Sequence, residues 1–137
     1  RYDSALPEHL SELAILVTAR YWSSGFEWSH HAPIALQVGV PEQAVTAIAH
    51  ARQAEFDDPQ MQAVFDFAVD LHLNKKVSDK GYDRAHAALG VQACVDLVGI
   101  CGYYTLISMT INVFDVEDGD GPTLPKLDMP IAAYFRN

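Results

Sequence analysis

Apolar residues recur at helical spacing along most of this chain, and this pattern limits the fold more than any other feature. Between Leu6 and Trp22 they fall three and four residues apart, which is the period of one face of an α-helix. The same period returns in later segments, and no stretch alternates apolar and polar residues as a half-buried strand does. The sequence therefore predicts an all-α fold of about six helices. The later helices are expected over about 26–38, 41–51, 61–74, 79–89 and 91–114.

The last of these segments, Val91 to Phe114, is the most apolar, and its length alone would suffice to span a bilayer. Asp96 and Asn112 lie within it, and no basic residues flank it, so a membrane span is disfavoured. We expect instead a central helix that neighbouring helices or partner subunits bury. Glycines at positions 99 and 102 would let another backbone approach this helix closely.

Two features of the chain's organisation concern proline and glycine. After Phe114 the composition shifts to Asp, Gly and Pro, which predicts a helical domain over 1–114 and an extended arm over 115–137 with one last short turn. Pro33 interrupts the second helical segment. Either that helix starts late, with Pro33 in its first turn, or it starts near Phe26 and kinks at Pro33; the sequence leaves both open.

Composition narrows the classes of partner. The chain has 137 residues, the size of one domain, with 18 acidic against 9 basic residues, so a net charge of −9 argues against nucleic acid. Two cysteines fit neither a disulfide framework nor a zinc site and favour a reducing compartment, so we expect a cytoplasmic protein. The chain opens at Arg1 without Met and with no leader pattern, and targeting stays open.

Three ionisable residues stand among apolar neighbours in the first two helical segments: Glu12, Glu27 and His31. Glu27 and His31 are four residues apart, which puts their side chains on one helix face, whereas His30 points about 100° away. If the stripe that carries Glu12 is buried, desolvation should raise the pKa of this carboxyl towards neutrality, as a general acid or base requires. The alternative is structural: Glu12 pairs with Arg20, and His31 is a satisfied core histidine.

A resemblance to a known family bears on this choice. The segment Leu13–Gly39, LAILVTARYWSSGFEWSHHAPIALQVG, preceded by Glu12, resembles the carboxymuconolactone decarboxylase and AhpD-like family. The peroxidase branch of that family carries a glutamate, eleven residues, a cysteine, two residues, a second cysteine, three residues and a histidine. Glu12 and His31 match the two ends, whereas Ser24 and Glu27 stand in place of the cysteines. The run GYYTLISMTINVF near the end of the last helix is also similar.

The resemblance implies an AhpD-like helical domain and a cofactor-independent lyase of the decarboxylase branch, without a metal. Its substrate would be a small carboxylated lactone or keto acid of aromatic degradation, with isomerisation or hydrolysis left open as the reaction. His31 would donate the proton and Glu12 would orient it. The remaining expected roles are tuning of the imidazole by Glu27, a grip on the substrate carboxylate by Arg20, an apolar wall from Trp28, and a substrate contact at Ser24.

The missing dithiol argues against a thiol peroxidase. Cys94 and Cys101 lie seven residues apart, about 10 Å along a helix axis, which is too far for a disulfide. Two alternatives to the lyase remain: a relative of the peroxidases that lacks their dithiol, and a non-catalytic oligomeric binding module. Because the first helix is apolar on two sides and the last is nearly uncharged, we expect a homo-oligomer; the family resemblance implies a trimer or hexamer.

Overall fold

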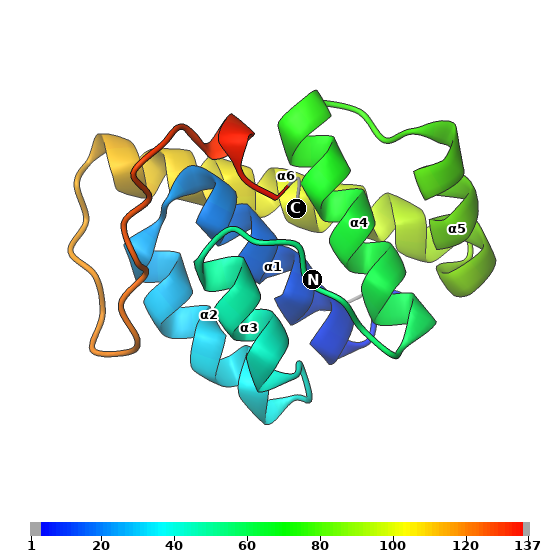
Figure 1. Ribbon diagram of the computed structural model, residues 1–137, viewed down its shortest axis with the longest axis horizontal. Coiled ribbons are helices and arrows are strands. Elements are labelled where there is room, and N and C mark those ends of the chain that lie inside the picture. Colours follow the sequence, from blue (N-terminus) through cyan, green and yellow to red (C-terminus); the bar gives the residue numbers. More distant parts are fainter. Residues whose placement is uncertain (1–3, 136–137) are drawn as a thin grey trace.

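The computed structural model describes residues 4–135, which form six α-helices and one 3₁₀ turn and contain no strand (Figure 1). This confirms the predicted all-α class and the number of helices. The elements in chain order are α1 (Glu8–Trp22), α2 (Gly25–Gln37), α3 (Glu42–Ala49), α4 (Pro59–Asn74), α5 (Asp79–Leu89), α6 (Val91–Val113) and the turn Ile131–Ala133.

Local chemistry explains where several helices begin. Asp58 caps α4 by accepting a hydrogen bond from the Gln60 backbone N–H at 2.8 Å, and Pro59 fills the first helical position, where no N–H is needed. Ser78 caps α5 in the same way, with its hydroxyl accepting from the Gly81 N–H at 3.1 Å. Gly90 then ends α5 with a positive φ of 86°.

Helix α1 is the centre of the fold, with α2, α4 and α6 packed around it (Figure 1). Every residue from Leu10 to Arg20 is buried, which includes both apolar stripes and the polar Glu12 and Thr18. The two-sided pattern of this segment therefore predicted its position correctly: a helix that is apolar on both sides needs neighbours on both.

Pro33 lies inside α2, which begins eight residues earlier at Gly25, so the early-start alternative is the one that the structure adopts. A proline has no N–H to donate, so the carbonyl of Ser29, four residues before it, loses its helical partner. The C-terminal arm passes this carbonyl at Gly121. A Cβ atom at position 121 would collide with the Ser29 oxygen, so only glycine fits there.

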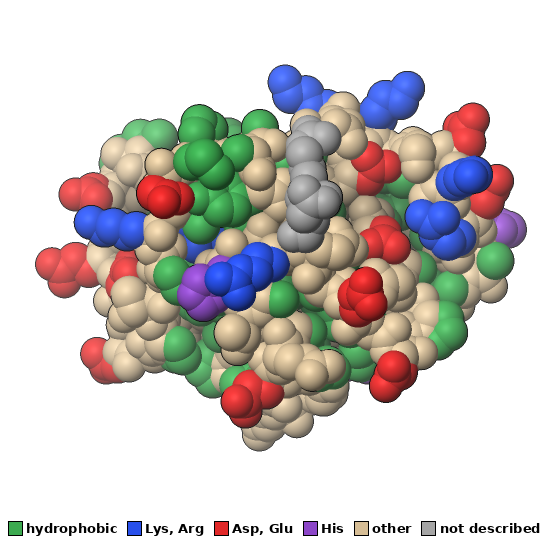
Figure 2. All heavy atoms as spheres, viewed as in Figure 1, with side chains coloured by type: hydrophobic (Ala, Val, Ile, Leu, Met, Phe, Trp, Pro, Cys, Tyr) green, Lys and Arg blue, Asp and Glu red, His purple; other side chains and the backbone are tan. Residues whose placement is uncertain are grey.

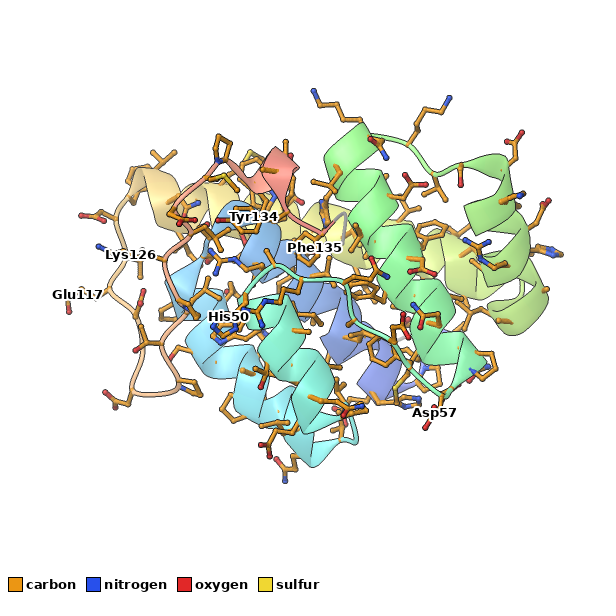
Figure 3. All side chains as sticks on the ribbon, viewed as in Figure 1. His50, Asp57, Glu117, Lys126, Tyr134 and Phe135 are labelled. Carbon is orange, nitrogen blue, oxygen red and sulfur yellow. The ribbon has the colours of Figure 1, made fainter. Side chains whose placement is uncertain are left out.

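The segment after α6 runs back over the helices as an extended arm (Figures 1 and 3). Its last described residue, Phe135, donates its backbone N–H to the Ala51 carbonyl at 2.7 Å and packs its ring against Phe65. Leu124 is buried as well. These contacts fix the arm at its middle and at its end.

Helix α6 runs along the long axis behind α1 and α4 (Figure 1), and in the single chain its neighbouring helices leave much of it exposed, so its burial by partner subunits stays a prediction. Its long apolar window is only one-third buried. By length and composition α6 is the one helix among the described residues that would suffice to cross a membrane, although a core helix of a soluble protein passes the same test. The face seen in Figure 2, in contrast, carries scattered acidic and basic side chains.

Candidate active site

The structure brings Glu12, Glu27 and His31 together in a buried cluster between α1 and α2. The His31 Nδ1 atom lies 2.7 Å from Glu12 Oε1, and its Nε2 atom lies 3.1 Å from Glu27 Oε2. The Glu27–His31 contact comes from their spacing of four on α2. The Glu12–His31 contact joins two helices that pack against each other. Both ring nitrogens of the imidazole are thus held by carboxylate oxygens.

This arrangement favours the charged imidazolium. Burial by itself would lower the pKa of His31, but the hydrogen bonds and charges of Glu12 and Glu27 outweigh it and raise the pKa to about 9. His31 therefore carries a proton on each nitrogen at neutral pH and donates one to each carboxylate. The cluster holds a proton that is available at pH 7 and is poised between two acceptors.

The cluster is almost closed to solvent. Glu12 and His31 are each 3% exposed and Glu27 is 7% exposed, so Glu27 is the member nearest to the outside. The ring of Tyr104, from α6, lies edge-on to His31 with centroids 5.3 Å apart. Helix α6 therefore forms one wall of the site.

Ser24 and Glu27 have the S-x-x-E spacing of a helix capping box, in which the serine hydroxyl and the glutamate would bind backbone N–H groups at the start of α2. The structure does not form it: Ser24 makes no side-chain cap, and Glu27 turns to His31 instead. The Ser24 hydroxyl is completely buried and has no hydrogen-bond partner. A buried unpaired hydroxyl costs about 1–3 kcal/mol, and such departures from local rules gather at functional sites.

Arg20 has a different environment from the one that the sequence suggested. Its guanidinium is buried and donates to the carbonyls of Ala49 at 2.9 Å and Pro125 at 2.7 Å, and to the Ser23 hydroxyl at 2.9 Å. Glu12 pairs with His31, so the alternative of a Glu12–Arg20 ion pair is wrong. The Nη1 atom holds the arm and the end of α3, and Nη2 holds Ser23, whereas the buried Nε atom has no hydrogen-bond partner among the described residues. Trp28, the expected apolar wall, is 2% exposed and belongs to the hydrophobic core.

None of the three cavities that we describe reaches the cluster. One lies between α4 and α5, lined in part by Asp66 and Asp70. Another lies under the arm at the turn between α1 and α2, lined by Arg20, Ser23 and Lys126 among others. The last lies between the end of α3 and the arm, beside Tyr134 (Figure 3).

A second buried histidine, His72 of α4, faces α1 on a different side. Its Nε2 atom lies 2.8 Å from the Thr18 hydroxyl, which itself donates to the Ala14 carbonyl, and its ring stacks on Tyr21. Burial lowers the pKa of His72 to about 4, so this ring is neutral at pH 7. Among residues 4–135 no group of three or more His, Cys, Asp or Glu side chains is arranged to hold a metal ion.

The two histidines should give stability a maximum near pH 6.5, the ordinary pKa of an imidazole. Folded His31 keeps its proton up to about pH 9, so the folded state binds more protons than the unfolded state between pH 6.5 and 9, and stability falls as pH rises through this window. For His72 the unfolded state binds more protons between pH 4 and 6.5, so stability falls as pH drops. Each effect is on the order of 3 kcal/mol.

Urea unfolding of wild type and His72→Gln at several pH values checks the acid side, because the glutamine removes the titration and keeps a polar partner for Thr18. The difference between the two free energies of unfolding should change between pH 6.5 and 4 and stay constant above pH 7. Parallel curves over the whole acid range would contradict a neutral, buried His72.

Comparisons of the chain with protein-family models, with curated proteins and with solved structures found no match. The family resemblance of the sequence therefore stays a prediction, and the function has to be argued from the geometry of the cluster.

Proposed function

We propose that this protein is a cofactor-independent carbon–carbon lyase of the carboxymuconolactone decarboxylase type, in an AhpD-like fold that lacks the dithiol. It acts on a small carboxylated lactone or keto acid by general acid catalysis. The observation that supports this most directly is the protonated His31 held between Glu12 and Glu27, with a pKa of about 9. A buried proton source of this kind is what an anionic intermediate needs.

The reaction needs one proton for each molecule of carbon dioxide released. The bond between the substrate carboxylate and its α-carbon breaks, and its electron pair passes into the neighbouring carbonyl to form an enolate. The α-carbon then takes a proton, the carbonyl re-forms, and solvent returns a proton to the protein. Proton donation contributes about 10²–10⁴-fold to such a rate, so the electrostatics of the site must supply the rest.

Glu27 is the residue that delivers the proton in this proposal. Both nitrogens of His31 are occupied by carboxylates, so the imidazolium cannot face a substrate directly. The Nε2 proton can pass to Glu27, whose Oε2 atom lies 3.1 Å from Nε2, and Glu27, the most exposed of the three, passes it to carbon. Glu12 holds the other side of the ring at 2.7 Å and keeps it oriented. This changes the expected role of Glu27 from tuning the imidazole to donating the proton.

The cysteines favour this reaction over a thiol peroxidase. Both are buried, and burial raises the pKa of Cys101 to about 12, so the thiolate that would attack a peroxide is disfavoured. Cys94 is seven residues away on the same helix, and burial raises its pKa too. They pack as small apolar residues in the core.

The test is release of carbon dioxide from a panel of small carboxylated lactones and keto acids, with deuterium incorporation from D₂O as a second readout. Glu27→Gln should lower kcat about 10²–10⁴-fold on any substrate that the wild type converts. The matched control is Glu42→Gln, because Glu42 is an exposed first-turn glutamate of α3. Activity should also fall as pH rises through 9, where His31 loses its proton. Equal kcat in Glu27→Gln and wild type would overturn the assignment.

One observation favours a second candidate, a non-catalytic oligomeric binding module that keeps the fold. The cluster is enclosed, and the cavities that we describe lie elsewhere. In that case the three residues only hold α1 and α2 together. Absence of turnover across the panel, together with unchanged thermal stability on adding each acid, would favour the module.

The remaining parts of the proposal concern the setting. We place the protein in the cytoplasm, because its two cysteines are free and buried and because the charged Asp96 lies within α6. We also expect self-association to a trimer or hexamer, because apolar side chains of α6 lie exposed in the single chain.

A further inference from the structure

One face of α6 carries an apolar stripe along its whole length. The residues of this stripe follow one another at spacings of three and four, so they lie in one row on the helix surface. Their side chains are exposed, from 41% at Met109 to 75% at Val113. The α6 stripe consists of Val91, Val95, Val98, Gly102, Leu106, Met109 and Val113.

The α6 stripe is symmetric about its central residue. Val98 and Leu106 lie four residues before and after Gly102, and Val95 and Met109 lie seven residues before and after it. The two ends, Val91 and Val113, lie eleven residues away on either side. If a second α6 runs antiparallel and crosses at Gly102, each apolar side chain therefore meets an apolar side chain of the other copy. A two-fold interface requires this kind of self-complementary surface.

The centre of the stripe is open enough for such a crossing. A Cβ atom built on Gly99 or on Gly102 would meet nothing within 4 Å, so neither glycine serves packing inside the chain. Glycine inside a helix costs about 1 kcal/mol relative to alanine. Two glycines at the middle of an exposed helix face instead allow another helix backbone to approach closely.

Charge and area favour a second copy over an unlike partner. The chain carries a net charge of −9, so two copies repel each other unless they meet at an uncharged surface. The α6 stripe has no charged member; Asp96 lies off the row and accepts a hydrogen bond from the Ala5 N–H at 2.6 Å. Tyr103 and Phe114, which are 54% and 75% exposed, lie beside the stripe and extend the apolar surface that a second copy would cover.

The geometry points to a two-fold dimer in which the α6 helices of two copies pack antiparallel and cross at Gly102. The opposite face of α6 places Tyr104 against His31, so the pairing would fix the helix that walls the candidate site. A two-fold pair also requires an even number of subunits, which a hexamer satisfies and a trimer alone does not.

Sedimentation velocity at micromolar concentration gives the first test. Wild type should sediment as a dimer of about 30 kDa, twice the 15.1 kDa chain, or as an even multiple of it. The double variant Val98→Glu, Leu106→Glu puts four charges at the interface and should separate the two members of each pair. The mass should therefore halve: a wild-type dimer should give monomers, a tetramer should give dimers of another interface, and a hexamer should give trimers. The matched control Tyr82→Glu, Val116→Glu adds the same charge at exposed sites outside α6 and should leave the mass unchanged.

Cysteine crosslinking tests the direction of the helices. In an antiparallel pair, Gly102→Cys faces its own copy across the two-fold axis and should form a disulfide-linked dimer under mild oxidation. Val95→Cys should not, because position 95 faces position 109 of the other copy. Crosslinking at both positions would indicate a parallel pair and overturn the proposal.

A monomeric wild type would also overturn the dimer. If that monomer bound phosphatidylcholine vesicles and Val98→Glu, Leu106→Glu did not, the stripe would be a membrane surface instead. These outcomes do not depend on the proposed lyase activity, so the dimer and the enzyme can fail separately.

Discussion

Replacing His31 by alanine should lower the free energy of unfolding by about 3–5 kcal/mol at pH 7, because the change leaves two buried carboxylates without their cation. Glu12 and Glu27 both bind this imidazole, and both are at least nine-tenths buried. Urea unfolding of wild type and variant at pH 7 measures the loss.

The adjacent histidine provides the control. His30 lies on the same helix, and its ring contacts that of His31 edge-on at 4.9 Å, but it is exposed and forms no ion pair with a carboxylate of residues 4–135. His30→Ala should therefore change stability by less than about 0.5 kcal/mol. A loss as large as that of His31→Ala would show that the two buried ion pairs do not carry the effect.

A triple variant separates stability from function. Replacing Glu12, Glu27 and His31 together by leucine removes all three charges, and apolar replacements of buried ion clusters are often neutral or stabilising. We expect this variant to recover most of the stability that His31→Ala loses and to have no lyase activity. That result would mean that the charged cluster is kept for chemistry rather than for folding.

The second large effect concerns Arg20. Arg20→Met should destabilise the fold by about 2–4 kcal/mol, because it leaves the carbonyls of Ala49 and Pro125 without a donor in a buried place. Arg20→Met also removes the free-energy cost of burying a guanidinium, which offsets part of this loss. Burial lowers the pKa of the guanidinium, as expected for a charge that is taken out of water. The larger consequence is local, since the arm loses the contact that fixes its middle.

Limited trypsin digestion followed by intact mass measurement detects this local effect. Lys126 directly follows the carbonyl that Arg20 holds, so cleavage after Lys126 should become at least about 10-fold faster in Arg20→Met. Arg84→Met is the control, because it removes an exposed arginine of α5. Unchanged cleavage at Lys126 would show that Phe135 and Leu124 suffice to hold the arm.

The helices could be predicted from the sequence because their signals are local. The period of three and four residues located all six, and Asp79–Leu89 has its predicted bounds, since Ser78 caps its start and Gly90 ends it. The first helix begins at Glu8 rather than at Leu6, because Pro7 stands at its N-cap. For Pro33 the sequence allowed two helix starts, and only the packing of α2 on α1 decided between them.

One of the two contacts in the candidate site could also be predicted from local spacing. Glu27 and His31 meet because they are four residues apart on one helix, which any α-helix guarantees. The contact of Glu12 with His31 depends on how two helices pack, and only the family resemblance predicted it. Two of the three partners of Arg20 could not be predicted at all, because they are backbone carbonyls 29 and 105 residues away that any sequence would offer.

The amino-acid sequence by itself determined the class of the fold, the helix positions and the pairing within α2, since these depend on residues a few positions apart. The tertiary structure decided which apolar face of each helix is covered. Hydropathy is the same for a buried valine and an exposed one, so the run 91–114 predicted a helix buried by neighbouring helices or partner subunits, whereas in the single chain α1, α4 and α5 cover one side of α6 and leave the other exposed. The tertiary structure likewise decided that the buried cation beside Glu12 is His31 and not Arg20. Burial and charge pairing depend on neighbours that the chain brings together only when it folds.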